Sequence, residues 1–218
     1  MTLNVELARH NMIEQQVRPW DVLDERVLNT LSALRREDFV PAAHRNLAFS
    51  DIRIPLDHGE VMMKPVVEGR VLQAVAAQPD ESVLEIGTGS GFLTACLARM
   101  AGEVLSIEQH ADFVQAAHAR LTDAGIVNVR LETAEAVRDF DPKRRFDVMV
   151  VTGAVAELPR HWQGWINPGG RLFAIVGTSP VQRACMYEQR DGAWLAQPLF
   201  ETDLPYLRNA APEPQFVL

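Results

Sequence analysis

Short apolar runs alternate with segments of helical periodicity in the second part of the chain. The apolar runs, each suited to one buried strand, are residues 82–86, 103–107, 127–132, 146–151 and 171–176. Two segments between them, at about 91–101 and 110–124, have helical character, and the connection after residue 131 is shorter and less regular. Strands that alternate with helices are typical of a parallel sheet covered on both faces. We therefore predict an α/β fold with a doubly wound, mostly parallel sheet.

The first part of the chain has a helical pattern interrupted by one irregular segment. Residues 3–17 have helical character, and Asp24 is placed to cap a helix whose apolar side chains recur on one face. A third apolar face follows at residues 67–75, after an irregular stretch at 50–65 that contains two prolines. These patterns predict an N-terminal helical subdomain with a loop over residues 1–78 and an α/β domain over residues 79–218.

The last forty residues have a strand pattern without a helix. Residues 183–189 and 194–199 are separated by Arg190-Asp-Gly192, which predicts an antiparallel hairpin at the edge of the sheet. The tail contains Pro205, Pro212 and Pro214. We expect it to run extended over the surface or to cover a sheet edge, because proline cannot donate to a strand ladder.

Three glycines at alternate positions follow the strand predicted at residues 82–86. Gly87 permits a tight turn, Gly89 permits a ligand to approach the backbone, and Gly91 permits the next helix to pack close to the strand. The N–H groups at that helix start would face a polar or anionic ligand group. A dinucleotide fingerprint needs its third glycine where this chain has Phe92, so NAD or FAD is the weaker interpretation. A turn that binds no ligand is the structural alternative.

A carboxylate at the end of the second predicted strand supports a nucleoside ligand. Glu108 stands 21 residues after Gly87, where a carboxylate can accept hydrogen bonds from both ribose hydroxyls of an adenosine. Its alternative role is to favour the start of the following helix. Because ligands of open α/β sheets bind beyond the carboxyl ends of the strands, Glu85, Glu135 and Thr152 are expected at the same edge. The segment at residues 50–65 could cover that edge, which makes it the candidate acceptor-binding loop.

Composition narrows the possible functions. The 218 residues include 21 basic and 29 acidic side chains, and the net charge of −8 argues against a protein that grips nucleic acid backbones. The sequence has no signal-peptide core and no apolar run of about 18 residues, so we expect a cytoplasmic protein without a membrane partner. Cys96 and Cys185 lack a metal-ligand spacing and are expected to be reduced thiols; no metal site is predicted.

The glycine motif together with Glu108 resembles motif I and its acidic partner in class I S-adenosylmethionine-dependent methyltransferases, which have a Rossmann-like fold. Four further segments resemble the protein-L-isoaspartate O-methyltransferase family in order and spacing: residues 12–18, 24–28, 36–41 and 167–172. The resemblance implies S-adenosyl-L-methionine as cofactor and methyl transfer to the carboxylate of isoaspartyl residues in damaged proteins. It implies a protein or peptide as acceptor, with a small molecule as the alternative.

The resemblance also implies roles for residues around the glycine motif. The glycines would form the floor under the methionine part of the cofactor, and Glu85 would orient its amino group. Glu108 would hold the ribose, and Glu135 would lie on the adenine side. The complete set of expected cofactor-binding residues is Glu85, Gly87, Thr88, Gly89, Gly91, Glu108, Gln109, Glu135 and Thr152.

The candidate acceptor loop departs from the family pattern. The family's Gly-Gln-Thr-Ile-Ser-x-Pro corresponds here to residues 59–65, in which Val61 replaces the threonine and Met63 the serine. A hydroxyl can donate a hydrogen bond to a carboxylate, whereas a thioether is only a weak acceptor. Met63 and His58 are therefore the candidate catalytic residues of an altered acceptor site. Simple packing is the alternative for Met63, and a hydrogen bond within the loop is the alternative for His58.

Three functions remain compatible with these patterns. The first is an isoaspartyl carboxyl methyltransferase. The second is a relative that retains the cofactor site and methylates another acceptor. The third is a module that binds S-adenosylmethionine without turnover.

Overall fold

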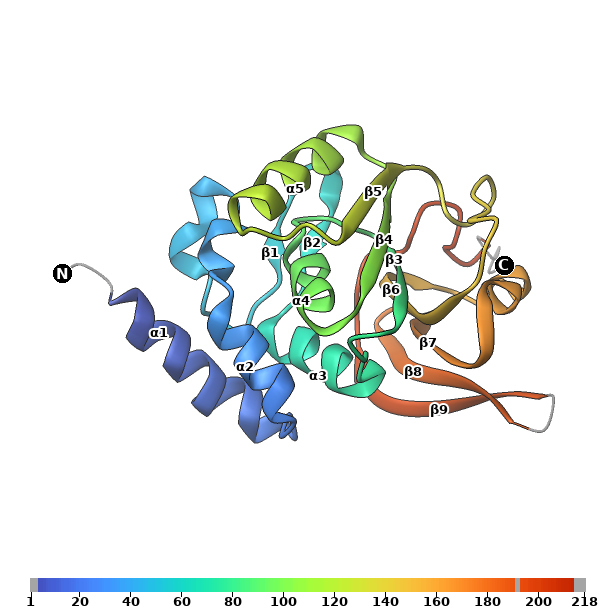
Figure 1. Cartoon of the computed structure of the whole chain (residues 1–218), viewed down its shortest axis with the longest axis horizontal. Helices are drawn as coiled ribbons and strands as arrows, with labels where there is room; N and C mark the ends of the chain where they lie inside the picture. Colours follow the sequence, from blue (N-terminus) through green and yellow to red (C-terminus); the bar gives the residue numbers. More distant parts are fainter. Residues whose placement is uncertain (1–3, 191–192, 214–218) are drawn as a thin grey trace, which may run out of the picture.

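We describe residues 4–190 and 193–213 of a computed structural model of the chain (Figure 1). The α-helices are α1 (Val5–Met12), α2 (Glu25–Ala33), α3 (Pro65–Val75), α4 (Phe92–Met100) and α5 (Ala111–Asp123). The strands are β1 (Ile54–Pro55), β2 (Val61–Met62), β3 (Ser82–Ile86), β4 (Glu103–Glu108), β5 (Val129–Thr133), β6 (Phe146–Val155), β7 (Ile166–Thr178), β8 (Val181–Arg190) and β9 (Ala193–Thr202).

A single large sheet organises the molecule. Its seven strands follow the order β5-β4-β3-β6-β7-β8-β9, in which the first five are parallel and the last two antiparallel. Two small strands, β1 and β2, form a separate antiparallel pair within the loop that precedes α3. The mostly parallel sheet and the C-terminal hairpin confirm the fold class predicted from the sequence. The turn predicted at residues 191–192 lies outside the described residues.

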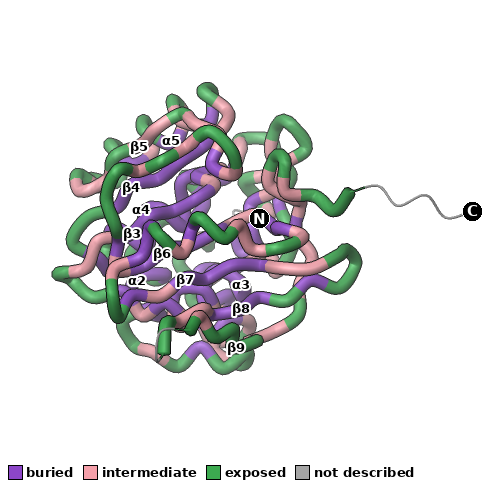
Figure 2. Tube along the Cα trace, turned by 90° about the vertical axis from the view of Figure 1, so that its right-hand side faces the viewer, coloured by how far each residue is buried: buried purple, intermediate pink, exposed green. Residues whose placement is uncertain are grey.

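The two faces of the sheet are covered by different kinds of structure. Alternate side chains of β3 point to opposite faces, so Val83 joins one core and Leu84 the other. Helices α1 to α5 contribute to the first core. The second core is closed by Trp162 and Trp165, which belong to the 3₁₀ helix Arg160–Trp165, and by the connection after β5. Figure 2 shows buried chain through the central strands and exposed chain around the rim.

The N-terminal segment contains the expected helices and packs on the first core, with one local difference. Asp24 caps α2 by accepting a hydrogen bond from the backbone N–H of Arg26 at 2.8 Å. The first helix is α-helical only over Val5–Met12 and continues as the π-helical segment Ile13–Val17. Residue 3, where we expected that helix to begin, lies outside the described residues.

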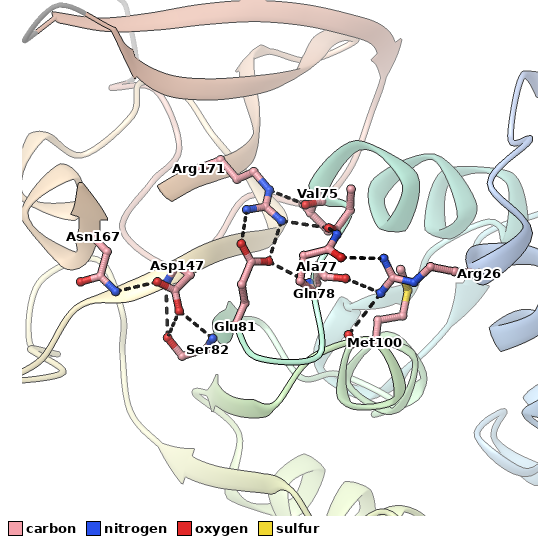
Figure 3. Close-up of polar contacts among 11 residues, drawn as sticks. Arg26, Val75, Ala77, Gln78, Glu81, Ser82, Met100, Asp147, Asn167 and Arg171 are labelled. Atoms are coloured by element: carbon pink, nitrogen blue, oxygen red, sulfur yellow. Dashed lines mark hydrogen bonds and ion pairs between the residues drawn. The ribbon is translucent and has the colours of Figure 1, made fainter. Parts of the chain in front are cut away.

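Polar contacts join the helices to the sheet at the amino ends of its strands (Figure 3). Arg171 of β7 donates to both carboxylate oxygens of Glu81 at 2.8 Å and to the carbonyls of Val75 and Ala76, where α3 ends. Arg26 of α2 donates to the carbonyl of Ala77 at 2.6 Å. These bonds fix the connection between α3 and β3 at the edge opposite the strands' carboxyl ends, where a ligand site is expected.

Strands β6 and β7 are longer than predicted. β6 continues past residue 151 because, after a register shift, Ala154 pairs with Ile175 of β7 and bridges to Tyr206 of the tail. β7 begins at Ile166, which pairs with Phe146, although residues 167–170 have the composition of a turn. The described part of the tail pairs with the carboxyl end of β6, a strand in the middle of the sheet, so it does not cover an edge strand as one of our two expectations had it. Pro214 lies outside the described residues.

Candidate functional site

One cavity lies at the carboxyl ends of β3, β4 and β6. Its enclosed volume is about 90 Å³, and it opens to solvent. Segments from all parts of the chain line it: residues 56, 60–63, 68, 86–90, 93, 107–109, 113, 134–137, 152–153 and 207–208. The position matches the rule that open α/β sheets bind ligands beyond the carboxyl ends of their strands.

The three glycines connect β3 to α4 with left-handed backbone at each of them. Gly89 has a φ of 51°, and a side chain there would meet only Leu56 Cδ1 at 3.6 Å, so its backbone faces the cavity. Gly87 has no space for a side chain, because a Cβ would collide with the Thr152 hydroxyl. A Cβ on Gly91 would lie 3.0 Å from Ala117 of α5. Gly91 therefore permits close packing against α5, and our expectation that it serves packing against the strand was wrong.

Glu108 ends β4 and faces the cavity, with 6% of its surface exposed. One carboxylate oxygen accepts the N–H of Gly89 at 2.9 Å, and the other accepts the N–H of His110 at 3.0 Å. A carboxylate has about four acceptor positions, so each oxygen keeps capacity for one more donor. The residue thus holds the glycine loop in place and can still accept hydrogen bonds from a ligand.

Glu85 lies beneath the cavity and is absent from its lining. Its side chain is fully buried, and one oxygen accepts from Thr94 of α4 at 2.5 Å and from Ser106 of β4 at 2.6 Å. The Ser106 hydroxyl is in turn 2.6 Å from that of Thr88. Our expectation that Glu85 reaches a ligand amino group directly is corrected by this position, because α4 covers the face of β3 to which Glu85 points.

The buried environment of Glu85 gives a prediction about pH. Burial raises its pKa from 4.5 to about 7, against the opposing effect of the Ser106 and Thr94 hydroxyls. At a pH between these two values, Glu85 is protonated in the folded chain and ionised in the unfolded chain. The contribution of Glu85 to the free energy of unfolding therefore falls as the pH rises. Glutamine does not titrate, so the variant Glu85→Gln should avoid this loss. As the pH is raised from 4.5 to 7.5, its free energy of unfolding should increase by about 3 kcal/mol relative to that of the wild type. Urea denaturation of both proteins across this range measures the difference, and parallel pH curves would contradict the prediction.

The other expected cofactor residues lie in the lining, and several of their polar side-chain atoms already have hydrogen-bond partners within the chain. Glu135 follows β5, and its oxygens accept the N–H groups of Val137 and Arg138 at 2.8 and 3.0 Å. The Thr152 hydroxyl donates to the backbone carbonyl of Ile86 or Gly87, and the Thr88 hydroxyl is engaged by Ser106. These side chains shape the wall of the cavity; whether they contact a cofactor stays a prediction.

The loop at residues 50–65 lies beside the cavity, where we expected an acceptor-binding segment. Met62 and Met63 are buried, with 4% and 5% of their surfaces exposed, and both contribute to the lining. The buried Arg36 holds the loop by donating to the carbonyl of Met63 at 2.7 Å and to that of Ala48 at 2.6 Å. Met63 thus packs in the core and also lines the cavity. Its catalytic role stays a prediction.

His58 is another expected site residue that the structure places outside the cavity lining, as it does Glu85 and Gly91. It lies in the turn between β1 and β2, outside the lining, and its Nε2 atom is 2.9 Å from a carboxylate oxygen of Asp112. The side chain is 41% exposed. A direct role for His58 in catalysis was the wrong interpretation, because the loop turns its ring toward α5.

Much of the cavity lining was not predicted from the sequence, including two acidic residues, Glu68 and Glu60, and two residues of the tail, Leu207 and Arg208. Glu68 of α3 is 1% exposed and pairs with Arg36 at 3.0 Å, while burial raises its pKa to about 7. Glu60 is half-buried beside Glu108. Leu207 and Arg208 arrive from the tail. No motif marks Glu68, Leu207 or Arg208, whereas Glu60 lies in the stretch at residues 59–65 that resembles the family's acceptor loop.

Together, the fold and this cavity define a Rossmann-like protein of the class I methyltransferase type. A family model described as protein-L-isoaspartate(D-aspartate) O-methyltransferase (PCMT) matches residues 8–202, and the chain belongs to this family.

Similar proteins are consistent with this assignment. The protein-L-isoaspartate O-methyltransferase of Koribacter versatilis (strain Ellin345) is 32% identical over 186 residues, which are 85% of this chain and 84% of the relative. Protein-L-isoaspartate O-methyltransferase 1 of Rhodopseudomonas palustris (strain HaA2) is 35% identical over 169 residues, or 78% of this chain and 69% of the relative.

A solved structure shares the fold at low sequence identity. It is a Plasmodium falciparum chain assigned to the protein-L-isoaspartate O-methyltransferases and determined in complex with S-adenosyl-L-homocysteine. The TM-score is 0.81 at 18% identity, over 95% of this chain and 99% of that one. Within the residues described for this chain, every helix is too short or too polar to span a bilayer.

Proposed function

We propose that this protein transfers a methyl group from S-adenosyl-L-methionine to the carboxylate of an isoaspartyl residue in a protein or peptide. The observation that carries the proposal is the cavity at the sheet edge, which places Glu108 and the backbone of Gly89 on one wall and the loop at residues 50–65 on another. Family membership over residues 8–202 supports the same activity.

The residues present fit the proposed cofactor. Gly89 leaves its backbone open to the cavity, and both oxygens of Glu108 keep acceptor capacity for the two ribose hydroxyls. Glu135 stands at the end of β5, where it would border the adenine. When bound, S-adenosylmethionine supplies an electrophilic methyl group on a sulfonium. The chain's task is to hold this group in line with the acceptor.

Methyl transfer to a carboxylate requires little proton transfer by the protein. A carboxylate acceptor has an ordinary pKa near ~4, so it is an anion at neutral pH and needs no general base. The alignment of methyl donor and acceptor, together with the exclusion of water from the cavity, then has the largest effect on the rate. Leu56, Met62 and Met63 provide an apolar wall for this purpose. Among the described lining residues, Arg208 is the only basic side chain, and it is placed to attract an anionic acceptor.

Glu108→Ala should weaken binding of S-adenosylmethionine by about 1.5–3 kcal/mol, the range for hydrogen bonds to a charged group. Titration calorimetry measures the effect. Glu103→Ala is the matched control, because Glu103 lies at the opposite end of the same strand and pairs with Arg144 on the surface. Equal affinity in the folded Glu108 variant and the control would remove Glu108 from the cofactor site.

The function is tested with a labelled methyl donor and two peptides of the same sequence, one containing isoaspartate and the other aspartate. Label should appear in the isoaspartyl peptide alone. Label in neither peptide, together with tight cofactor binding, would contradict the proposed acceptor.

A different acceptor is the second candidate function, and the loop itself favours it. Val61 and Met63 offer no hydroxyl to a carboxylate, and the carbonyl of Met63 is already bonded to Arg36. The acidic Glu60 also lines the cavity, whereas the charge of Glu68 is paired with that of Arg36. Such surroundings suit a neutral or cationic acceptor better than an anion.

Restoring the two hydroxyls of the family's loop distinguishes an isoaspartyl acceptor from a different acceptor. Val61→Thr with Met63→Ser should raise turnover on the isoaspartyl peptide about tenfold or more, since each 1.36 kcal/mol removed from the barrier is a factor of ten. Rates are compared at saturating donor, with thermal melting to confirm that both proteins are folded. Fast turnover by the wild type would show that backbone N–H groups suffice. No turnover by either protein would favour another acceptor.

A further inference from the structure

Two imidazoles and two carboxylates meet where the turn between β1 and β2 contacts the start of α5. The rings of His58 and His110 are stacked, with centroids 4.0 Å apart and planes within 4°. One ligand atom from each of His58, His110 and Asp112 lies within 4.8 Å of the others. Glu60 approaches from the loop, with a carboxylate oxygen 3.9 Å from His110 Nε2. Imidazole and carboxylate groups are the ligand types that bind divalent transition-metal ions such as Zn²⁺.

We propose that this cluster binds one divalent transition-metal ion of the Zn²⁺ type. His58, His110 and Asp112 are its protein ligands, and Glu60 or water completes the coordination. His58, His110 and Asp112 lie outside the cavity lining and only Glu60 belongs to it, so the proposal does not depend on methyl transfer.

The charge around the cluster favours a cation. Four carboxylates, those of Asp57, Glu60, Glu108 and Asp112, lie close enough to His58 to interact with it electrostatically, and Glu60 also faces His110. Within residues 4–190 and 193–213, no arginine or lysine forms an ion pair with any of these four. Elsewhere on the surface, exposed acidic groups such as Glu103 and Asp141 do pair with basic side chains. Apart from the two imidazoles, which face Asp112 and Glu60, the acidic groups of this cluster therefore form no ion pair with a basic side chain in the described part of the chain.

The distances require only side-chain adjustment. Zn–N and Zn–O bonds of 2.0–2.2 Å place the ligand atoms of a tetrahedral site about 3.3–3.5 Å apart, within ~1.5 Å of the largest separation seen here. The side chains of His58 and Asp112 are 41% and 57% exposed, so their rings and oxygens can rotate toward one ion. Phe113 contacts both imidazoles edge-on at 5.3 and 5.4 Å and limits how far they can move apart.

A bound ion would join the loop to the cofactor side of the cavity. His58 and Glu60 belong to the loop, whereas His110 directly follows β4 and its N–H group is bonded to Glu108. Coordination would therefore tie the loop's turn to the segment that holds Glu108. The ion would thereby stabilise the position that the loop has beside the cavity.

The test uses untagged, metal-free protein titrated with zinc chloride, with binding followed by competition against a chromophoric chelator. The wild type should bind one Zn²⁺ per chain. His58→Ala and His110→Ala should each lower the affinity at least about tenfold, the smallest loss expected when a metal site is perturbed. His118→Ala is the matched control, because His118 is an exposed histidine of α5 outside the cluster, and it should bind like the wild type.

Thermal melting provides a second readout. Excess zinc should raise the melting temperature of the wild type and of His118→Ala, but not that of the His58→Ala, His110→Ala double variant. Asp112→Asn, which keeps the shape of an exposed side chain, should also weaken binding and serves if a histidine variant fails to fold. The proposal is overturned if the wild type shows no saturable binding, or if the two single histidine variants retain wild-type affinity.

Discussion

Arg36→Met should lower the free energy of unfolding by about 3–5 kcal/mol, the cost of removing one partner of a buried ion pair. Arg36 has no exposed surface, and it pairs with Glu68, which is 1% exposed. Its guanidinium also donates to the carbonyls of Ala48 and Met63. The substitution leaves a buried carboxylate and two carbonyls without their donor. Urea denaturation at neutral pH measures the loss.

Arg35→Met is the matched control for this prediction. Arg35 precedes Arg36 in the chain, but its side chain is 68% exposed and pairs with Asp38 on the surface, where a pair contributes little. Adding Glu68→Leu to Arg36→Met should recover part of the loss, because the unpaired carboxylate is then removed. A loss below about 1 kcal/mol in Arg36→Met would show that this pair does not hold the loop.

Gly89→Val should abolish binding of S-adenosylmethionine. The backbone of Gly89 is left-handed at a φ of 51°, a conformation that a β-branched residue rarely adopts. A valine side chain would also project into the cavity, since a Cβ at this position would have only Leu56 within 4 Å. Titration calorimetry with the cofactor measures the result.

Gly125→Val separates the effect of strain from the effect on the cavity. Gly125 is also left-handed, with a φ of 69°, and a Cβ there meets nothing within 4 Å. It follows α5 and lies outside the lining. The control should be destabilised by a similar strain and still bind the cofactor. Retained binding in Gly89→Val would show that the glycine loop does not form the cofactor floor.

Local patterns in the sequence were sufficient for the fold and for part of the cavity. Apolar runs and helical periodicity predicted the strand and helix order, because each depends on residues close together in the chain. The place of Glu108 was also predictable. It follows a parallel strand directly, and the carboxyl ends of parallel strands share one edge. The irregular segment at residues 50–65 was expected to cover this edge from its place in the chain, and the resemblance to the family then supplied the motif with which it was compared.

Only the tertiary structure decided which polar groups face the cavity. Glu85 and Glu108 both lie at or near strand ends, but α4 covers the face to which Glu85 points, so only Glu108 reaches the lining. The pairing of Arg36 with Glu68 and the meeting of His58 with Asp112 join segments 32 and 54 residues apart. Such contacts depend on how helices, loop and sheet pack together, which neither periodicity nor spacing along the chain encodes.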